Sequence, residues 1–239
     1  MQLAPSPPGA VTLGQAAWAL MFVVLYIALA TGAVLGLGLS GLVDFTLGTL
    51  LPVALGSITL AAILALYVHL VRRNSLRPAQ LGFRRPTVRL FHLLWQIPAT
   101  IITAALLQSL FLVALTLAGL DTSTAGAQDD SLADIAGMSP PFLLASVLVI
   151  AVLTPLWEEV LFRGAFLDGL SRRFHPALAI ALSAALFAAV HLVFLTFVYL
   201  FALGVALAML RRFHQNLWAP ILLHAVNNGF VLLIVTTLV

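Results

Sequence analysis

The sequence predicts an all-α protein, a polytopic bundle of transmembrane helices that crosses the bilayer about seven times. Two observations support this fold class: 62% of the 239 residues are hydrophobic, and only 8% are charged. Such a chain has too few polar residues to cover the surface of a water-soluble globule. A third observation is that the apolar residues form long runs, and a helix needs about 20 such residues to cross the hydrocarbon core.

The apolar runs divide the chain into its expected spans. They lie roughly at 15–39, 46–71, 90–119 and 141–162, followed by a longer tract at 176–238. One polar interruption at 211–216 leaves about 35 residues of that tract before it and about 22 after it. The piece of about 35 residues is too long for one span and long enough for two short ones. We therefore expect a hairpin whose turn lies near Phe194–Phe197.

Charged residues segregate between alternate loops. Six arginines lie in the loop at 72–89, whereas the neighbouring loops contain aspartates, namely Asp44 in one and Asp121, Asp129, Asp130 and Asp134 in the other. Because basic residues in short loops favour the cytoplasmic side, we expect a multi-pass protein of the plasma (inner) membrane with a cytoplasmic N-terminus and an external C-terminus. We interpret the first apolar run as a retained span and not a signal peptide. The arginines are interpreted as a topology signal, with a patch for anionic lipid as the alternative, and residues 121–138 as a flexible outer loop.

The composition also limits the partners of the chain. All eleven basic residues are arginine, and the pI of about 10.2 reflects the small number of acids. We therefore expect no nucleic-acid partner and expect membrane lipid to surround the chain. The absence of cysteine excludes disulfides and thiolate chemistry.

The stretch from Thr154 to Arg163 places two adjacent carboxylates in an apolar segment. Glu158 and Glu159 are the only glutamates in the chain. Ionisable residues at membrane depth are rare and usually face a bundle interior or a watery cavity, so they are candidates for a functional site. Glu159 and Arg163 are four residues apart, so in a helix Arg163 can neutralise Glu159. Glu158 points about 100° away and stays available to another partner.

Further polar residues lie within the apolar tract at 176–238. They are His191, His224, Asn227 and Asn228. His224 and Asn228 are four residues apart and share one helix face, about 6 Å apart along the axis, whereas Asn227 is turned about 100° away from it. Any one of these side chains alone is more often a hydrogen-bonding group between helices. Their combination with the glutamate pair indicates a functional site.

Three motifs follow one another in the order Glu158-Glu159-x-x-x-Arg163, Phe187-x-x-x-His191 and His224-x-x-x-Asn228. They resemble the signature motifs of the CPBP family, which contains the CAAX prenyl endopeptidases and the bacteriocin-processing or bacteriocin-immunity proteins. These are multi-pass intramembrane proteases. The resemblance covers about residues 140–235, so we describe residues 1–120 as N-terminal transmembrane helices and residues 121–239 as a CPBP-like catalytic core. It implies that Glu158 and His191 act on the attacking water, and that His224 and Asn228 stabilise the oxyanion.

Elementary chemistry leads to the same four candidates. Peptide hydrolysis needs a base that activates water and donors that stabilise the developing oxyanion. Glu158 can be the base and His191 can orient the water, while His224 and Asn228 can donate hydrogen bonds from one helix face. Glu159 and Arg163 are expected to support the site as an ion pair. The expected substrate is a peptide or lipidated peptide, in peptide processing or in bacteriocin immunity.

Two alternatives remain open from the sequence. A zinc ion could be held by Glu158, His191 and His224, although the chain lacks H-E-x-x-H, and we favour a mechanism that requires no cofactor. The second alternative is a proton- or cation-coupled transporter, or a non-catalytic membrane scaffold. Internal repeats are common in transporters, and the chain shows none.

The predicted boundaries place two candidate residues at different depths. Glu158 lies about 5 residues from the expected end of the fourth span, or roughly 8 Å deep. His191 lies about 15 residues into a fifth span that starts at Pro176. If the site forms, we expect it in the cytoplasmic half of the membrane, and the two spans must then be offset or tilted.

Overall fold

The computed structural model describes residues 11–43, 45–122 and 138–238, and these residues contain helices and no β-strand. The N-terminal part contains α1 (Leu13–Leu39), α2 (Leu47–Ala65), η1 (Leu66–Arg72), α3 (Pro78–Leu81), η2 (Val88–His92) and α4 (Leu93–Leu117). Next come α6 (Pro140–Leu148), η4 (Val149–Leu153), α7 (Thr154–Glu159), η5 (Val160–Phe166) and α8 (Leu167–Ser171). The last elements are α9 (Pro176–Ala189), η6 (Phe194–Thr196), α10 (Phe197–His214) and α11 (Trp218–Leu238).

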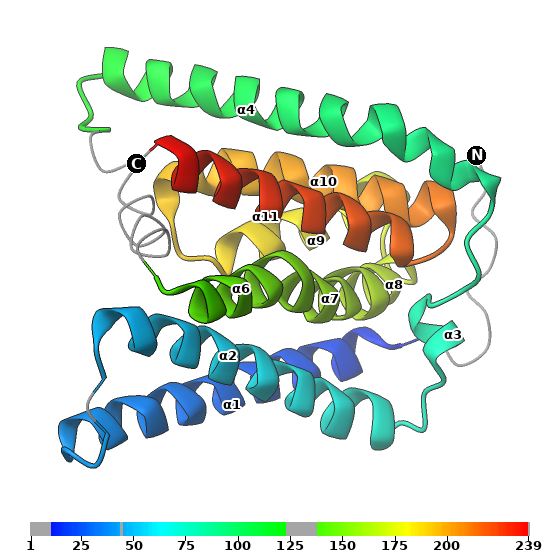
Figure 1. Cartoon of the computed structure of the whole chain (residues 1–239). Coiled ribbons are helices and arrows are strands. Elements are labelled where there is room, and N and C mark those ends of the chain that lie inside the picture. The colour runs from blue at the N-terminus through cyan, green and yellow to red at the C-terminus, as the bar shows by residue number, and fades with distance from the viewer. Residues whose placement is uncertain (1–10, 44, 123–137, 239) are drawn as a thin grey trace.

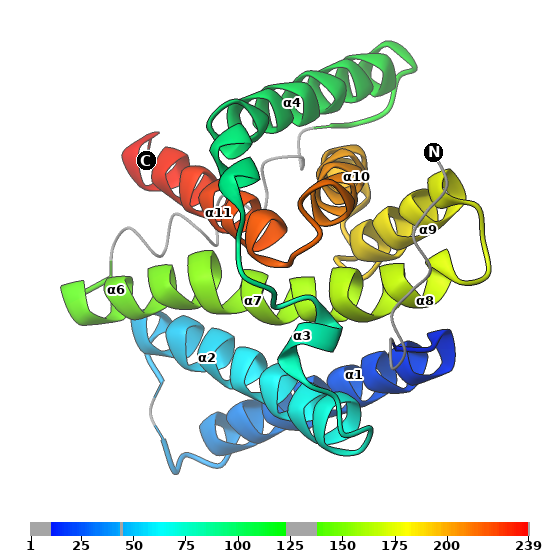
Figure 2. The same ribbon diagram turned by 90° about the vertical axis from the view of Figure 1, so that its right-hand side faces the viewer.

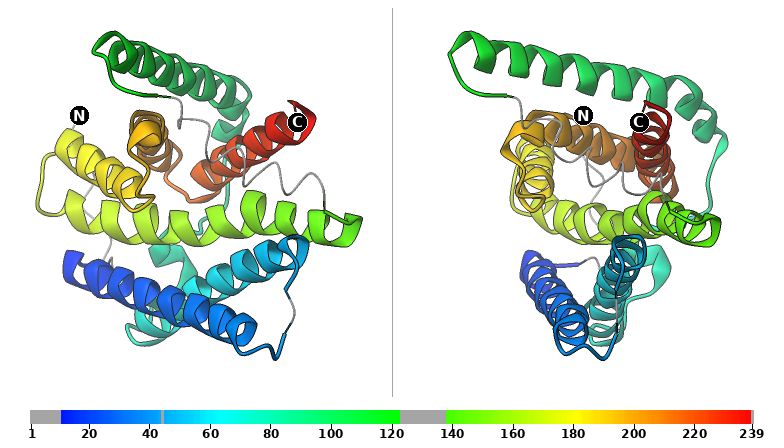
Figure 3. Two further views of the ribbon diagram at one scale, coloured as in Figure 1. Left: turned by 90° about the vertical axis from the view of Figure 1, so that its left-hand side faces the viewer. Right: turned by 60° about the vertical axis from the view of Figure 1, so that its left-hand side comes forward.

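The helices lie in layers (Figure 1 and Figure 2). The pair α1 and α2 forms one outer layer, and the continuous helix from α6 to α8 lies across it. The helices α9, α10 and α11 form the next layer, and α4 covers that layer from the other side. Figure 3 shows that the helix from α6 to α8 runs between the two neighbouring layers along their whole width. The middle of this helix, residues 158–167, is buried between these layers, whereas Leu144 and Leu148 of α6 are exposed.

The lengths of the helices agree with the predicted fold class. Five helical segments are long and apolar enough to cross a membrane: Leu13–Leu39, Thr49–Arg72, Val88–Leu117, Pro140–Ser171 and Phe194–His214. Two shorter apolar helices, Pro176–Ala189 and Trp218–Ile234, bring the described total to the expected seven. A polytopic transmembrane helix bundle is thus confirmed. The hairpin expected within the tract at 176–238 is present as α9 and α10, and η6 lies in the turn between them.

The predicted end of the fourth span is wrong, and His191 does not lie within a helix as predicted. The fourth span was expected to end at 162, but its helix continues to Ser171, because Arg163 is paired and fully buried instead of marking the end of the span. Glu158 is thus about 20 Å from the end of its helix, and His191 is about 22 Å from the start of α9 at Pro176. The two residues thus lie at similar distances along the chain from the ends of their helices. His191 itself lies just beyond the end of α9, in the turn, and not within a helix.

On both sides of the glutamates, the backbone hydrogen bonds of the central helix reach five residues back instead of four. In η4, the N–H of Thr154 donates to the Val149 carbonyl, five residues back. In this register the donor for the Ile150 carbonyl would come from Pro155, which has no N–H. The segment η5, directly after Glu159, has the same wide pattern. Such single wide turns inside helices often occur at functional sites.

The N-terminal helices pack directly against the central helix. A single cluster of buried side chains joins Ala19 of α1 and Ala65 of α2 to Leu161 and Phe162 of η5. Gly169 of α8 permits a close approach, because a Cβ atom there would lie 2.9 Å from the Leu13 backbone. The two parts of the chain described from the sequence thus share one apolar core.

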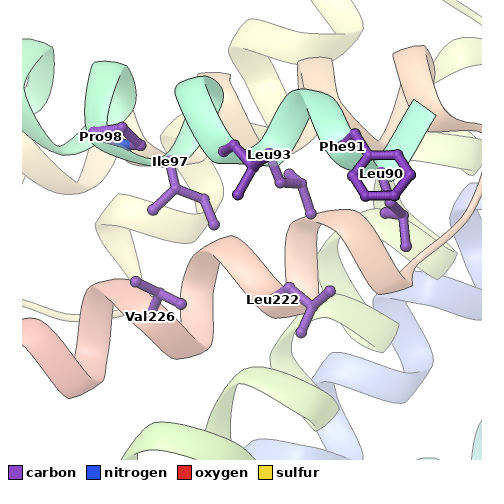
Figure 4. A pocket seen from close by; sticks show the side chains of 8 residues that line it. Leu90, Phe91, Leu93, Ile97, Pro98, Leu222 and Val226 are labelled. Carbon is purple, nitrogen blue, oxygen red and sulfur yellow. The ribbon is translucent and has the colours of Figure 1, made fainter. Parts of the chain in front are cut away.

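The helix α4 contacts the bundle along only part of its surface. An apolar cavity of about 490 Å³ separates the start of α4 from α11, lined by Leu90, Phe91, Leu93, Leu94, Ile97, Pro98, Leu222 and Val226 (Figure 4). A larger cavity of about 840 Å³ lies between α4 and α10. Gln108 of α4 makes two polar contacts with the bundle, since it donates to the Leu195 carbonyl and accepts from the Tyr199 N–H. Gln108 thus fixes α4 to the turn before α10.

Candidate active site

Glu159 lies at the centre of a buried polar cluster. Its Oε1 atom is 2.8 Å from Nη1 of Arg163 and 2.9 Å from Nδ1 of His224. The side chains of Glu159 and Arg163 have no exposed surface, and Arg163 also donates from Nη2 to the Gly204 carbonyl at 3.2 Å. The ion pair expected from the four-residue spacing is present. Because a buried charge without a partner is strongly destabilising, these contacts connect the central helix firmly to α10 and α11.

His224 lies between the two glutamates. Its Nδ1 atom faces Glu159, and its Nε2 atom lies 3.7 Å from Oε2 of Glu158. A carboxylate only accepts hydrogen bonds, so Nδ1 carries the proton of the short contact. The Nε2 atom is therefore directed at Glu158 but is too far away for a hydrogen bond. The sequence prediction for His224 did not include its contact with Glu159.

His191 lies near this cluster, and its ring orientation is fixed. Its Nδ1 atom is 2.7 Å from the Phe187 carbonyl, which can only accept. The neutral ring then presents an unprotonated Nε2 atom. Phe187 packs edge-on against both His191 and His224, with ring centroids 4.9 and 5.6 Å apart. Both histidines lie within electrostatic range of Glu158.

Asn228 of α11 contacts the central helix at a point away from the two glutamates. Its Nδ2 atom donates to the Ile150 carbonyl at 3.1 Å, the carbonyl for which Pro155 supplies no helical donor. The amide nitrogen has two hydrogens, so one of them remains for another acceptor. Asn228 therefore connects α11 to η4, about two turns before the glutamates.

A chain of hydrogen bonds leads to Asn228 from the far side of the bundle. The hydroxyl of Tyr199 donates to Oδ1 of Asn227, whose Nδ2 atom donates to Oδ1 of Asn228 at 3.3 Å. Gln108 accepts from the backbone N–H of Tyr199. Helical spacing turns Asn227 away from the His224 face, and the sequence analysis makes no prediction for Tyr199 or Gln108. The sequence signals for them are the polar Gln108 within the apolar helix α4 and Tyr199 two residues after the start of α10.

The buried glutamates, the bridging histidine and the three motifs lie in one segment of the chain. Residues 140–230 match the model of the Rce1-like family, described as type II CAAX prenyl endopeptidase Rce1-like. This match confirms the resemblance predicted from the motifs. It includes Glu158, His191, His224 and Asn228, and residues 1–139 lie outside it. No curated protein and no solved structure matches the chain.

The Rce1-like segment does not contain a formed metal site in the described residues. Nowhere among them do three or more His, Asp or Glu side chains converge as ligands. Nδ1 of His191 and Nδ1 of His224 each face a protein oxygen, which leaves their Nε2 atoms as the ring nitrogens available to a metal. The expected set of Glu158, His191 and His224 is not gathered into a three-ligand group in the described residues. No step below depends on a metal.

Proposed function

We propose that the chain is an intramembrane endopeptidase that hydrolyses peptide bonds of lipid-modified or membrane-embedded peptides with water activated by Glu158. The single observation that supports this most is the position of His224, with one ring nitrogen on Glu159 and the other directed at Glu158. The family match supports endopeptidase activity in general. The assignment of individual roles is our own.

Glu158 is the proposed general base. It is buried, and Nε2 of His224 lies 3.7 Å from its Oε2 atom, so a carboxylate in this position can take a proton from a water molecule held between it and His191. His191 can hold this water molecule, because its Nε2 atom is available to accept a hydrogen bond. The water oxygen then attacks the peptide carbonyl carbon, and the proton passes to the leaving amine.

His224 and Asn228 are the proposed donors to the oxyanion. A protonated His224 can donate from Nε2, which faces Glu158 without a hydrogen bond in the resting structure. Asn228 can donate its second amide hydrogen, because only one is required by the Ile150 carbonyl. Preorganised donors of this kind often supply the largest single contribution to acyl transfer.

Glu159 and Arg163 support the site from within the core. We propose that Glu159 does more than neutralise Arg163, because it also accepts from Nδ1 of His224 and so directs the opposite ring nitrogen toward Glu158. This arrangement resembles the way in which a buried carboxylate orients the histidine of a hydrolase triad. The support role is thus one of orientation as well as charge.

The family description suggests prenylated CAAX peptides as the substrate class. A role in peptide processing or in bacteriocin immunity is compatible with the same chemistry. We propose the plasma (inner) membrane as the location, with a cytoplasmic N-terminus and an external C-terminus. In support of one common cytoplasmic side, η1, α8 and α10, which each end next to arginines, finish at the side of the bundle where α3 lies (Figure 1).

The test uses the purified chain in liposomes with a farnesylated peptide that ends in a CAAX sequence. Release of the C-terminal tripeptide is followed by mass spectrometry for the wild type and for Glu158→Gln. We expect release by the wild type and a loss of about 100-fold or more in the variant, because the general base is removed while its shape is kept. Equal cleavage by both proteins contradicts the mechanism. A wild type that moves protons across the liposome without cleaving any peptide favours the transporter alternative.

A further inference from the structure

A second charged cluster lies at the end of the central helix, apart from the glutamates. Asp168 of α8 is ten residues beyond Glu158 on the same continuous helix, a distance of about 15 Å along the axis. Four arginines lie within electrostatic range of this single carboxylate: Arg84, Arg172, Arg211 and Arg212. We propose that this cluster is a binding site for a phosphate group.

The floor of the site is built into the fold. Arg211 is only 8% exposed, and its Nη2 atom lies 3.3 Å from Oδ2 of Asp168. Its guanidinium group packs directly on Gly82, where a Cβ atom would lie 2.8 Å from Nη2. Gly82 has a φ of +106°, a conformation that suits glycine. The Gly82 carbonyl accepts from the Leu217 N–H at 2.9 Å, so the segment after α3 is attached to the start of α11.

The donors at this floor exceed the acceptors. Nε of Arg211 and Nη1 of Arg212 are buried, and neither has a hydrogen-bond partner among the residues that the structure describes. Buried polar groups in proteins are nearly always hydrogen-bonded. Among the described residues, Asp168 forms its ion pair with Arg211, and Arg84 and Arg212 also lie within electrostatic range of it. An anion with several oxygens would accept from these donors and offset the excess positive charge.

The chemistry and the position both favour phosphate. The guanidinium group offers a planar fork of donors that matches a phosphate group. Arg84 and Arg172 are exposed within electrostatic range of Asp168, while the buried Arg211 forms the floor. The site lies at the ends of α8 and α10, where long apolar helices meet polar segments. Headgroups of anionic phospholipids lie at this level of a membrane, and free phosphate offers the same chemistry from water.

The experiment compares binding of two phosphate sources to the purified full chain. Native mass spectrometry counts the phosphatidylglycerol molecules retained from mixed micelles, with phosphatidylcholine as the reference lipid. A separate titration with inorganic phosphate follows the thermal unfolding temperature. Retention of phosphatidylglycerol with no effect of phosphate identifies a lipid headgroup as the ligand. A rise of the unfolding temperature with phosphate identifies free phosphate as sufficient. Neither effect in the wild type overturns the proposal.

Variants separate a built site from general charge attraction. Arg84→Gln/Arg212→Gln removes two guanidinium groups and leaves the Arg211–Asp168 pair intact. We therefore expect the affinity for the phosphate ligand to fall by about tenfold or more. The matched control is Arg72→Gln/Arg77→Gln, which removes the same charge from exposed positions near the same loop. Equal losses in both double variants overturn the proposal.

A third variant is expected to raise the affinity for phosphate instead of lowering it. Asp168→Asn removes the carboxylate that competes for Arg211, so phosphate should bind more tightly than to the wild type. A fold that is merely damaged would not gain affinity. Weaker or unchanged binding to a variant that retains its helical circular dichroism contradicts the assignment.

Discussion

The imidazole ring of His224 lies between the two glutamates of the chain, with Nδ1 at 2.9 Å from Glu159 and Nε2 at 3.7 Å from Glu158. Adjacent residues on one helix point about 100° apart. A single ring inserted from α11 can therefore contact both only because its two nitrogens lie on opposite sides. Glu159 is thus an anchor for Arg163 and for His224 at the same time.

Replacement of Glu159 by glutamine should destabilise the protein. The change leaves the buried Arg163 without its counter-charge, and breaking a buried pair costs about 3–5 kcal/mol. We expect a lower thermal unfolding temperature and a lower yield of folded protein. A Glu159→Gln protein that is as stable as the wild type but inactive would indicate that the roles of Glu158 and Glu159 are exchanged.

Removal of the Tyr199 hydroxyl should reduce catalysis more than substrate binding. Tyr199→Phe breaks the hydrogen bond to Asn227 and so loosens the chain that holds Asn228. We expect kcat to fall about tenfold, as for the loss of one buried hydrogen bond of about 1–1.5 kcal/mol, with KM unchanged. Tyr67→Phe is the matched control, because Tyr67 is 56% exposed on η1. A higher KM with an unchanged kcat would show that Tyr199 serves substrate binding instead.

A methyl group at Gly204 should separate α9 from α10. A Cβ atom at this position would lie 3.0 Å from both Cα and Cβ of Ala184, and the Gly204 carbonyl accepts from Arg163. We expect Gly204→Ala to lower stability by about 1–3 kcal/mol, as for other overpacked sites, and to lower activity. Gly32→Ala is the control, because no atom lies within 4 Å of the added group on α1. Similar unfolding temperatures for the two variants would show that the helices can separate without cost.

Treatment with a chelator tests the zinc alternative. If Glu158 activates water directly, 1,10-phenanthroline should leave peptide cleavage unchanged at concentrations that inactivate a zinc protease assayed in parallel. The measurement is the rate of tripeptide release before and after treatment. Inactivation that is reversed by added zinc would assign Glu158, His191 and His224 to a metal site in the active protein.

The sequence alone was sufficient for features that depend on local spacing. The hydrophobic composition and the length of the apolar runs predict the membrane bundle, because the bilayer fixes the length of a spanning helix. The four-residue interval predicts the contact between Glu159 and Arg163, since these positions are neighbours on any helix. The order of the three motifs predicts the family that the match over residues 140–230 supports.

The tertiary structure decided the contacts that join distant parts of the chain. His224 meets Glu159 across 65 residues, and Asn228 meets the Ile150 carbonyl across 78. No periodicity within one helix specifies such pairs, because they depend on how the helices are stacked and on the carbonyl that Pro155 leaves without a donor. For a related reason, the sequence does not predict that the central helix extends to Ser171. Arg163 resembles the end of a span until its buried partners are known.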